Sequence, residues 1–285
     1  MRKQFVKTTS EILFSNDKSA LLLGDIGVFG FRSALKEFPD RVFNFGILEQ
    51  AMVSAAAGFA EKGFHPIVST IAPFIVNRAF EQIKIDFGYQ GLKGTFITVG
   101  ASFDYAQLGA THYCPEDIVL ISTIPEMNVY IPGSSKEVST CIIRSQSNSL
   151  NYVRLSEQTH SYDIQSVGLI KLTENNSKKA IIFFGPSLEL KSLITDDNAY
   201  EQYYCNELSS IFDQDFSNLN EITLVSDFYL DSVVASIALK NPWIELRAVS
   251  PDKQFYRGYG SYSDAIRELG CGAEKFSELL KELNY

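Results

Sequence analysis

Two segments hold the residues best suited to chemistry. Glu49 lies near the start of ILEQAMVSAAAGFAEKG, where nearly all of the following residues are small or apolar. A carboxylate is rarely buried without a partner. Glu49 therefore either stands in a first helical turn, where the helix dipole favours it, or is kept dry for a chemical reason. His112 lies in GATHYCPED, between an apolar run and a helical pattern, and can act there as a capping group or in proton transfer.

A third segment, LGDIGVFG, places Asp25 among glycines directly after an apolar run. It lacks the GK[ST] ending of a phosphate-binding P-loop and the spacing of a GxGxxG dinucleotide fingerprint. Taken alone, this segment predicts a tight turn.

The composition is that of a globular protein with a substantial core, with 285 residues, 45% apolar and 21% charged. The formal net charge of -9 and the scattered Lys and Arg residues argue against a general nucleic-acid or anionic-membrane surface. No apolar segment is long enough for a signal peptide or a membrane span, so we expect a cytoplasmic protein. The four cysteines and three histidines show no zinc-binding spacing, which favours reduced, structural thiols.

The elements that must position these residues alternate along the chain. Apolar runs predict buried strands at 20–23, 65–69, 95–99, 127–131 and 152–155, with helical patterns between them at 46–62, 73–88, 115–123 and 134–147. Apolar strands joined by helical crossovers predict a parallel sheet covered on both faces. Ligands gather at the carboxyl ends of the strands in such sheets, which is where all three segments fall.

The polar stretch SEQTHSYDIQSVG is typical of a linker, and a second alternation follows it. Strands are predicted at 180–184, 222–225 and 244–249, and a terminal helix at 273–283 has apolar residues at helical spacing. We therefore predict an α/β protein with two domains, residues 1–160 and 165–285. Each domain is expected to have three α/β/α layers and a mostly parallel sheet.

Taken together, three stretches resemble the transketolase family: GILEQAMVSAAAGFAEKGFHPIVST, NRAFEQIKID and LGATHYCPEDIVLISTIPEMNVYIPG. The resemblance covers residues 8–160 and continues weakly to GSYSDAIRELGCGAEKF near the end. It is a resemblance to the second half of a transketolase. It implies a thiamine-diphosphate pyrimidine-binding fold followed by a fold like the transketolase C-terminal domain.

The resemblance implies a role for several residues towards thiamine diphosphate. Glu49 matches the glutamate that hydrogen-bonds N1′ of the aminopyrimidine and so helps to remove the proton from the thiazolium C2. Phe74 matches an aromatic residue placed against the pyrimidine ring, and Asp25 matches an acidic loop position near the cofactor. Ile71 and Asn77 stand where transketolases usually have two further aromatics, so the cofactor pocket is less aromatic than in the family.

The substrate side departs from the family pattern. Gly100 and Glu157 stand where transketolases usually have a histidine and an arginine that bind the substrate phosphate, and Leu108 replaces an aspartate that contacts a donor hydroxyl. Exchanging a phosphate-binding arginine for glutamate turns attraction into repulsion. We therefore expect a substrate that is not an ordinary sugar phosphate, such as an unphosphorylated or nucleotide-linked sugar.

Four other residues are candidates for substrate contacts. His112 matches the family histidine that handles substrate hydroxyls and protons, and Gln107 lies in the same loop. Arg78 and Arg154 lie in the matching segments and could still bind a phosphate. His112 and Glu49 together form the predicted catalytic pair.

The family holds Mg²⁺ and the diphosphate through a Gly-Asp-Gly motif and a downstream Asn on a preceding domain. No Gly-Asp-Gly occurs in this sequence, which starts just before the pyrimidine-binding type of domain. A divalent ion is needed to bridge the diphosphate to protein oxygens. We therefore expect no metal ligands in this chain. We also expect a partner subunit that supplies the metal site, an α2β2 assembly, small sugar substrates, and no nucleic acid or membrane partner.

The resulting prediction is one subunit of a split, transketolase-like transferase that moves a two-carbon ketol unit from a ketose donor to an aldehyde acceptor and is active only with its partner. Two enzymatic alternatives remain open: the β-subunit of a 2-oxo acid decarboxylating complex, and an enzyme like deoxyxylulose-phosphate synthase. A third alternative is a non-catalytic scaffold that has kept the fold.

Overall fold

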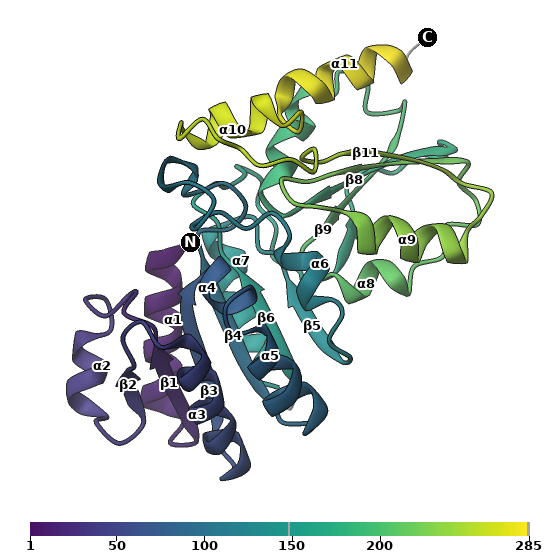
Figure 1. Cartoon of the computed structure of the whole chain (residues 1–285). Helices are drawn as coiled ribbons and strands as arrows, with labels where there is room; N and C mark the ends of the chain where they lie inside the picture. Colours follow the sequence, from purple (N-terminus) through teal and green to yellow (C-terminus); the bar gives the residue numbers. More distant parts are fainter. Residues whose placement is uncertain (148, 284–285) are drawn as a thin grey trace.

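Two sheets, each flanked by helices, form the frame of the molecule (Figure 1). The computed structural model describes residues 1–147 and 149–283, so the last two residues of the expected second domain lie outside the described residues. All pairings in the first sheet are parallel, and in the second only β7 runs antiparallel to its neighbour. The prediction of an α/β fold with mostly parallel sheets is confirmed.

The strands of the first sheet lie in the order β2 (Val42–Asn44), β1 (Ser19–Leu23), β3 (His65–Ile71), β4 (Gly94–Val99), β6 (Leu150–Arg154) and β5 (Met127–Tyr130). Those of the second lie in the order β11 (Glu245–Val249), β10 (Glu221–Val225), β8 (Lys179–Phe184), β9 (Glu201–Cys205) and β7 (Leu169–Lys171). Every residue of β1, β4, β6, β9 and β10 is buried, as expected for strands covered on both faces.

Helices cover both faces of the first sheet. Helices α1 (Arg2–Ser15) and α7 (Ser135–Arg144) pack together on one face. On the other face lie α3 (Glu49–Glu61), α4 (Ala72–Val76), α5 (Phe80–Gln82), the π-helix η1 (Ile83–Tyr89) and α6 (Asp117–Ile121). Two short helices connect strands at the sheet edge: α2 (Arg32–Glu37) and the 3-10 helix η2 (Ala106–Leu108).

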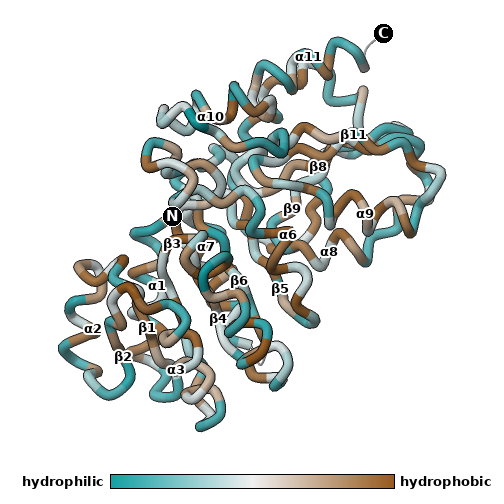
Figure 2. The backbone as a smooth tube through the Cα atoms, viewed as in Figure 1, coloured by the Kyte–Doolittle hydropathy of each residue, from teal (hydrophilic) through white to brown (hydrophobic). Residues whose placement is uncertain are grey.

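The second sheet is covered in the same way. Helix α11 (Ala273–Leu283) and the 3-10 helix η3 (Gly185–Leu193) pack on one face, and α8 (Ser209–Phe212) and α9 (Asp231–Lys240) pack on the other. Helix α10 (Tyr262–Glu268) lies against the loops between the two sheets. Figure 2 shows apolar stretches among the strands and helices of both halves. The buried apolar side chains of these elements pack between the layers.

One apolar cluster continues from the first sheet into the second, so the two halves share a core. It includes Val68 and Phe96 of the first sheet and Ile182 and Leu224 of the second. Main-chain hydrogen bonds also join them: Ile131 N–H donates to Asn206 O at 2.8 Å, and Leu208 N–H donates to Val129 O at 2.9 Å. The relative position of the two sheets is therefore fixed by packing and by hydrogen bonds.

Some predicted elements differ from the structure. The single helix expected at 73–88 is interrupted. Residues 77–79 are not helical and separate α4 from α5, and α5 continues directly into the π-helix η1. Strand β9 was not predicted, because its sequence EQYYC opens with two polar residues. The Glu201 side chain is nevertheless buried, accepting from the Tyr203 hydroxyl at 2.5 Å and pairing with Lys171 at 3.1 Å. Helix α1 was missed because buried Thr8 and Thr9 obscure its apolar pattern.

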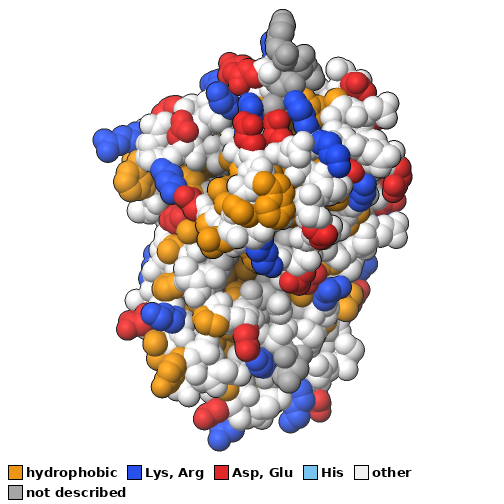
Figure 3. Space-filling model, turned by 90° about the vertical axis from the view of Figure 1, so that its right-hand side faces the viewer, with side chains coloured by type: hydrophobic (Ala, Val, Ile, Leu, Met, Phe, Trp, Pro, Cys, Tyr) orange, Lys and Arg blue, Asp and Glu red, His pale blue; other side chains and the backbone are white. Residues whose placement is uncertain are grey.

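On the face shown in Figure 3, charged side chains of both signs lie among apolar ones. Among the described residues, no helix is both long enough and apolar enough to span a bilayer.

Candidate active site

The candidate site lies at one edge of the first sheet, where its parallel strands end. Asp25 follows β1, Glu49 opens the helix after β2, and Ile71 ends β3. The carboxyl ends of parallel strands meet at the same edge, which is the usual place for a ligand in such sheets.

Glu49 is the first residue of α3, and its side chain is almost fully buried, with 1% exposed. Its Oε2 accepts a hydrogen bond from Arg78 Nη1 at 2.7 Å. Its Oε1 is also buried and has no hydrogen-bond partner in the described part of the chain. A buried carboxylate oxygen without a partner is costly, so this atom marks a place where a hydrogen-bond donor is missing.

Phe74 lies next to this ion pair. The Arg78 guanidinium carbon stands 4.2 Å above the centre of the Phe74 ring. On the same ring, His112 packs edge-on at 5.3 Å between ring centres. Glu49, Arg78, Phe74 and His112 thus form one continuous group, drawn from α3, from the segment α4–Arg78 and from the loop after η2. We call it the Glu49–His112 cluster.

His112 is held by its neighbour and by its loop. Its Nδ1 lies 2.8 Å from Thr111 Oγ1, which leaves Nε2 available to exchange a proton with another molecule. Asn77 Nδ2 donates to Glu116 Oε1 at 2.9 Å, so the end of α4 is tied to the segment that follows His112.

The other predicted cofactor residues lie around this cluster. Asp25 is exposed in a left-handed conformation (φ +63°), and its Oδ1 accepts from Asn44 Nδ2 at 3.2 Å. Asn44 Oδ1 in turn accepts from the main-chain N–H groups of Asp25 and Gly46 at 3.0 and 3.1 Å, which fixes the turn leading towards Glu49. Ile71 is buried in the core beneath Phe74, and Gln107 is exposed on η2.

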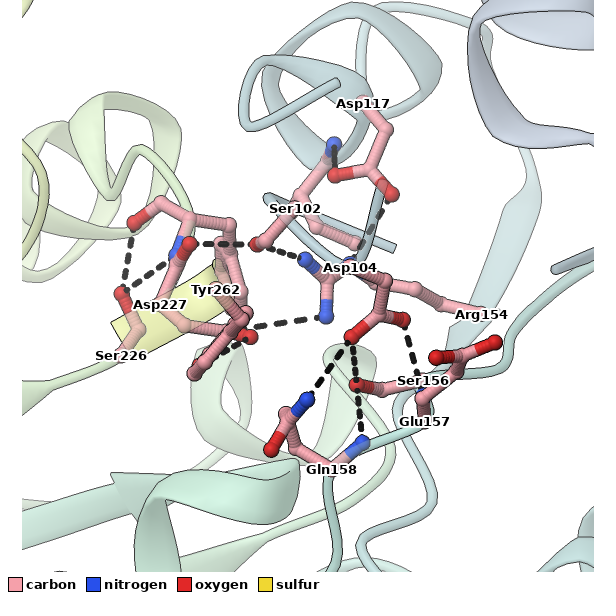
Figure 4. A network of polar contacts seen from close by, with 12 residues as sticks. Ser102, Asp104, Asp117, Arg154, Ser156, Glu157, Gln158, Ser226, Asp227 and Tyr262 are labelled. Atoms are coloured by element: carbon pink, nitrogen blue, oxygen red, sulfur yellow. Dashed lines mark hydrogen bonds and ion pairs between the residues drawn. The ribbon is translucent and has the colours of Figure 1, made fainter. Parts of the chain in front are cut away.

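Arg154 is a correction to the sequence-based expectation. Its side chain is 0% exposed, so it cannot bind a substrate phosphate. Its Nε donates to Asp117 Oδ2 at 2.9 Å, its Nη1 to Asp227 Oδ1 at 3.3 Å, and its Nη2 to Ser102 Oγ (Figure 4). Because Asp227 follows β10, this arginine joins the first sheet to the second.

The Arg154 contacts support the loop that carries His112. Ser102 pairs with Cys114 across this loop, with Cys114 N–H donating to Ser102 O at 2.9 Å, and Ser102 Oγ donates to Asp227 O. Tyr113 OH donates to the Tyr256 carbonyl at 3.2 Å. Hydrogen bonds to the loops at Asp227 and Tyr256 of the second half therefore hold the His112 loop in place.

Burial governs the ionisation of this network. Burial alone would lower the pKa of Arg154, but the Asp117 and Asp227 carboxylates outweigh it and raise that pKa. Burial raises the pKa of Asp117, although Arg154 opposes the shift. Burial also raises the pKa of Asp104 to about 7, with the charge of Asp227 adding to the shift and the Glu157 N–H opposing it.

Asp104, Asp117 and Asp227 were missed as important residues. The sequence could have indicated Asp117, because it stands directly before the apolar run IVLI. Like Glu49, it is a carboxylate next to residues expected to be buried. The partners of these carboxylates come from distant segments, and no sequence pattern identifies them.

Two of the three altered substrate positions, Gly100 and Glu157, line one small cavity, whereas Leu108 is exposed elsewhere on η2. Gly100, Tyr105 and Glu157 border a space of about 330 Å³ beside the N-terminus. Gly100 has φ +74°, and a Cβ there would lie 2.3 Å from the Tyr105 ring. A histidine side chain therefore does not fit at position 100 unless Tyr105 moves. Among the described residues, no group of three or more His, Cys, Asp or Glu is arranged to hold a metal ion.

A family model for the pyrimidine-binding domain of transketolase matches residues 7–161. The chain belongs to the transketolase family. A protein of Rhodococcoides fascians, described as an uncharacterized 33.6 kDa protein in the fasciation locus, is 36% identical over 159 residues, 55% of this chain and 51% of that protein. An apulose-4-phosphate transketolase subunit of Actinobacillus succinogenes is 31% identical over 161 residues, 54% of this chain and 51% of that protein.

The matches to these two relatives thus span about half of their length. A solved chain described as a split gene transketolase, inactive beta4 tetramer, has a TM-score of 0.83 and covers 99% of this chain and 97% of its own. Its sequence identity is 23%, so this likeness concerns the fold.

The buried Arg154 network makes a first prediction. Arg154→Leu should lower the free energy of unfolding by about 3–5 kcal/mol, because two buried carboxylates lose their counter-ion. Lys136→Leu is the control: Lys136 pairs with Asp163 at 2.8 Å, and both side chains are exposed, at 71% and 60%. This substitution should have a much smaller effect, because exposed ion pairs contribute little to stability. Denaturant unfolding measures both, and equal effects would contradict the assignment.

Asp104 makes a prediction about pH. Its pKa rises from 3.8 to about 7 on folding, so in that interval the folded state holds a proton that the unfolded state has released. The free energy of unfolding should therefore fall as pH rises from about 4 to 7. Asp104→Asn should flatten this decline in unfolding measured at several pH values. Asp163→Asn, at an exposed carboxylate whose pKa is lowered by Lys136, should leave the decline in place.

Proposed function

We propose that this chain is one subunit of a split, transketolase-like enzyme that transfers a two-carbon ketol unit between a ketose donor and an aldehyde acceptor. Thiamine diphosphate is the proposed cofactor. A partner subunit holds the diphosphate and Mg²⁺, and this chain contributes the pyrimidine side of the site.

The observation that carries the proposal is the unpartnered Oε1 of Glu49. This oxygen is buried at the end of the sheet where a ligand is expected, and Phe74 is joined to Glu49 through Arg78, which bonds Oε2 and stacks on the ring. An aminopyrimidine offers a hydrogen-bonding ring nitrogen and an aromatic face, so it fits a carboxyl oxygen and a phenyl ring together. The residues present therefore suit the pyrimidine half of thiamine diphosphate.

When bound, thiamine diphosphate supplies the nucleophilic carbon and the electron sink that ketol transfer needs. The residues of this chain do the remaining work. Glu49 binds the pyrimidine N1′ and holds or shares its proton, and Phe74 orients the ring. His112, with Nδ1 paired to Thr111, exchanges protons with substrate hydroxyls through Nε2.

The names of two similar proteins support the need for a partner. One relative is named as a single subunit of a transketolase, and the solved chain of closely similar fold is described as an inactive tetramer of β chains. By analogy, we propose that this chain alone is inactive and that the working assembly is α2β2.

The substrate is proposed to be a sugar without a phosphate in the usual position. Glu157 is exposed at the cavity with Gly100, which lacks a side chain where a histidine is expected. Met1, Arg2 and Lys3 line the same cavity. Of the two arginines that could compensate, Arg154 is fully buried and Arg78 is paired with Glu49. The relative from A. succinogenes is named for a phosphorylated sugar, and kinetics with free and phosphorylated ketoses separate that case from ours.

The first experiment is a tagged pull-down from the native cell, followed by mass spectrometry and a thiamine diphosphate assay. Co-elution of a chain with a Gly-Asp-Gly motif and a downstream Asn, together with cofactor, is the expected result. A chain recovered alone and without cofactor would favour the scaffold alternative.

In that complex, Glu49→Gln should reduce turnover by about 100-fold or more, because the variant cannot exchange a proton with the pyrimidine. The amide can still accept the Arg78 hydrogen bond, so folding should be retained. Glu61→Gln, an exposed position at the other end of the same helix, is the control and should keep full activity. Unchanged turnover in Glu49→Gln would exclude the catalytic role.

Kinetics with paired phosphorylated and free ketoses test the substrate. The free sugar should have a kcat/KM at least equal to that of its phosphate, since Glu157 repels a phosphate. Glu157→Arg should shift the ratio towards the phosphate by about 10-fold, the effect of about 1.4 kcal/mol. A strong preference of the unaltered enzyme for the phosphorylated sugar would contradict the proposal.

A further inference from the structure

Arg78 contacts both residues that a bound pyrimidine would need. Its Nη1 donates to Glu49 Oε2 at 2.7 Å, and its guanidinium carbon stands 4.2 Å above the Phe74 ring. The guanidinium is a flat cation that donates in its own plane and stacks through its face. Here it does both at once, on the carboxylate and on the aromatic ring.

An aminopyrimidine in the proposed site would contact the same two residues, Phe74 through its ring face and Glu49 through Oε1. Phe74 is half-buried against the core and meets the edge of His112, so Arg78 covers ring surface that the rest of the fold leaves open. Only one flat group can stack on that ring surface at a time, although Arg78 leaves the second carboxylate oxygen of Glu49, Oε1, without a partner among the described residues. Arg78 and the pyrimidine should therefore exclude each other.

We propose that Arg78 is an internal occupant of the pyrimidine position, which it fills in the subunit without cofactor and leaves when the cofactor binds. The inference rests on the proposed cofactor role of Glu49. It assigns to Arg78 the regulation of cofactor loading.

The two ends of the ion pair are suited to this exchange. Glu49 is 1% exposed at the first turn of α3, so its carboxyl group cannot turn out to water. Arg78 is 38% exposed, so its long side chain can swing into solvent without unfolding its surroundings. While it remains in place, it neutralises a buried carboxylate that would otherwise be unpaired.

The test uses the isolated full-length chain and two probes: acetamidine, a small flat cation, and 4-amino-2,5-dimethylpyrimidine. Arg78→Ala should lower the Tm, because Glu49 loses its counter-ion, and millimolar amounts of either probe should restore it. The unaltered chain should bind the pyrimidine at least about 10-fold more weakly than Arg78→Ala, by titration calorimetry. Arg78→Ala/Glu49→Gln should lose this binding.

Arg32→Ala is the matched control. Arg32 also stacks on a phenylalanine, at 4.3 Å from the centre of Phe29, but its Nη1 donates to a carbonyl and not to a carboxylate. Neither probe should change its Tm. Should Arg78→Ala fail to fold, Arg78→Lys keeps the charge but loses the flat face, and it should bind the pyrimidine more tightly than the unaltered chain.

The outcomes separate this inference from the proposed function. Equal pyrimidine binding by the unaltered chain and Arg78→Ala, abolished by Glu49→Gln, would overturn the occupant role and leave the cofactor role of Glu49 standing. If acetamidine restores the Tm of Arg78→Ala but the pyrimidine does not, the position binds only a counter-ion for Glu49, and this result would overturn the inference. Absence of rescue by either probe would also overturn it.

Discussion

The buried guanidinium of Arg154 is the contact on which the arrangement of the site depends. An arginine without exposed atoms must have its charge and its donors satisfied inside the protein, and here Asp117, Asp227 and Ser102 satisfy them. These three residues come from α6, from the loop after β10 and from the loop after β4. One side chain therefore brings together the second sheet, the first sheet and the base of the loop that carries His112.

The Glu49–His112 cluster is organised differently. Its residues follow strands β2, β3 and β4 of the first sheet, and its central carboxylate keeps one oxygen without a partner in the described part of the chain. The Arg154 guanidinium has hydrogen-bond partners on all three nitrogens and connects the two sheets. In the Glu49–His112 cluster, by contrast, one carboxylate oxygen can still accept a hydrogen bond from a bound molecule. A ligand is positioned precisely when the residues that bind it are held by a rigid network whose own hydrogen bonds are all made.

The sequence was sufficient for strands that are mostly apolar, such as β1, β4 and β10, because strands buried on both faces are usually rich in apolar residues. It was insufficient for β9, where Glu201 is buried with partners from other segments. The same reason explains the site. Family resemblance located Glu49, Phe74 and His112, but the pairing of Glu49 with Arg78 and the burial of Arg154 depend on tertiary contacts. A charged residue looks alike in sequence whether it faces water or a counter-ion.

The glycine at position 100 constrains the cavity that it lines. Its positive φ is strained for any other residue, and the Tyr105 ring occupies the space that a side chain would take. A single substitution to histidine would meet both obstacles, so it requires Tyr105 and the local backbone to change as well. Gly100 and Tyr105 thus set the shape of this cavity jointly, and they can change only together.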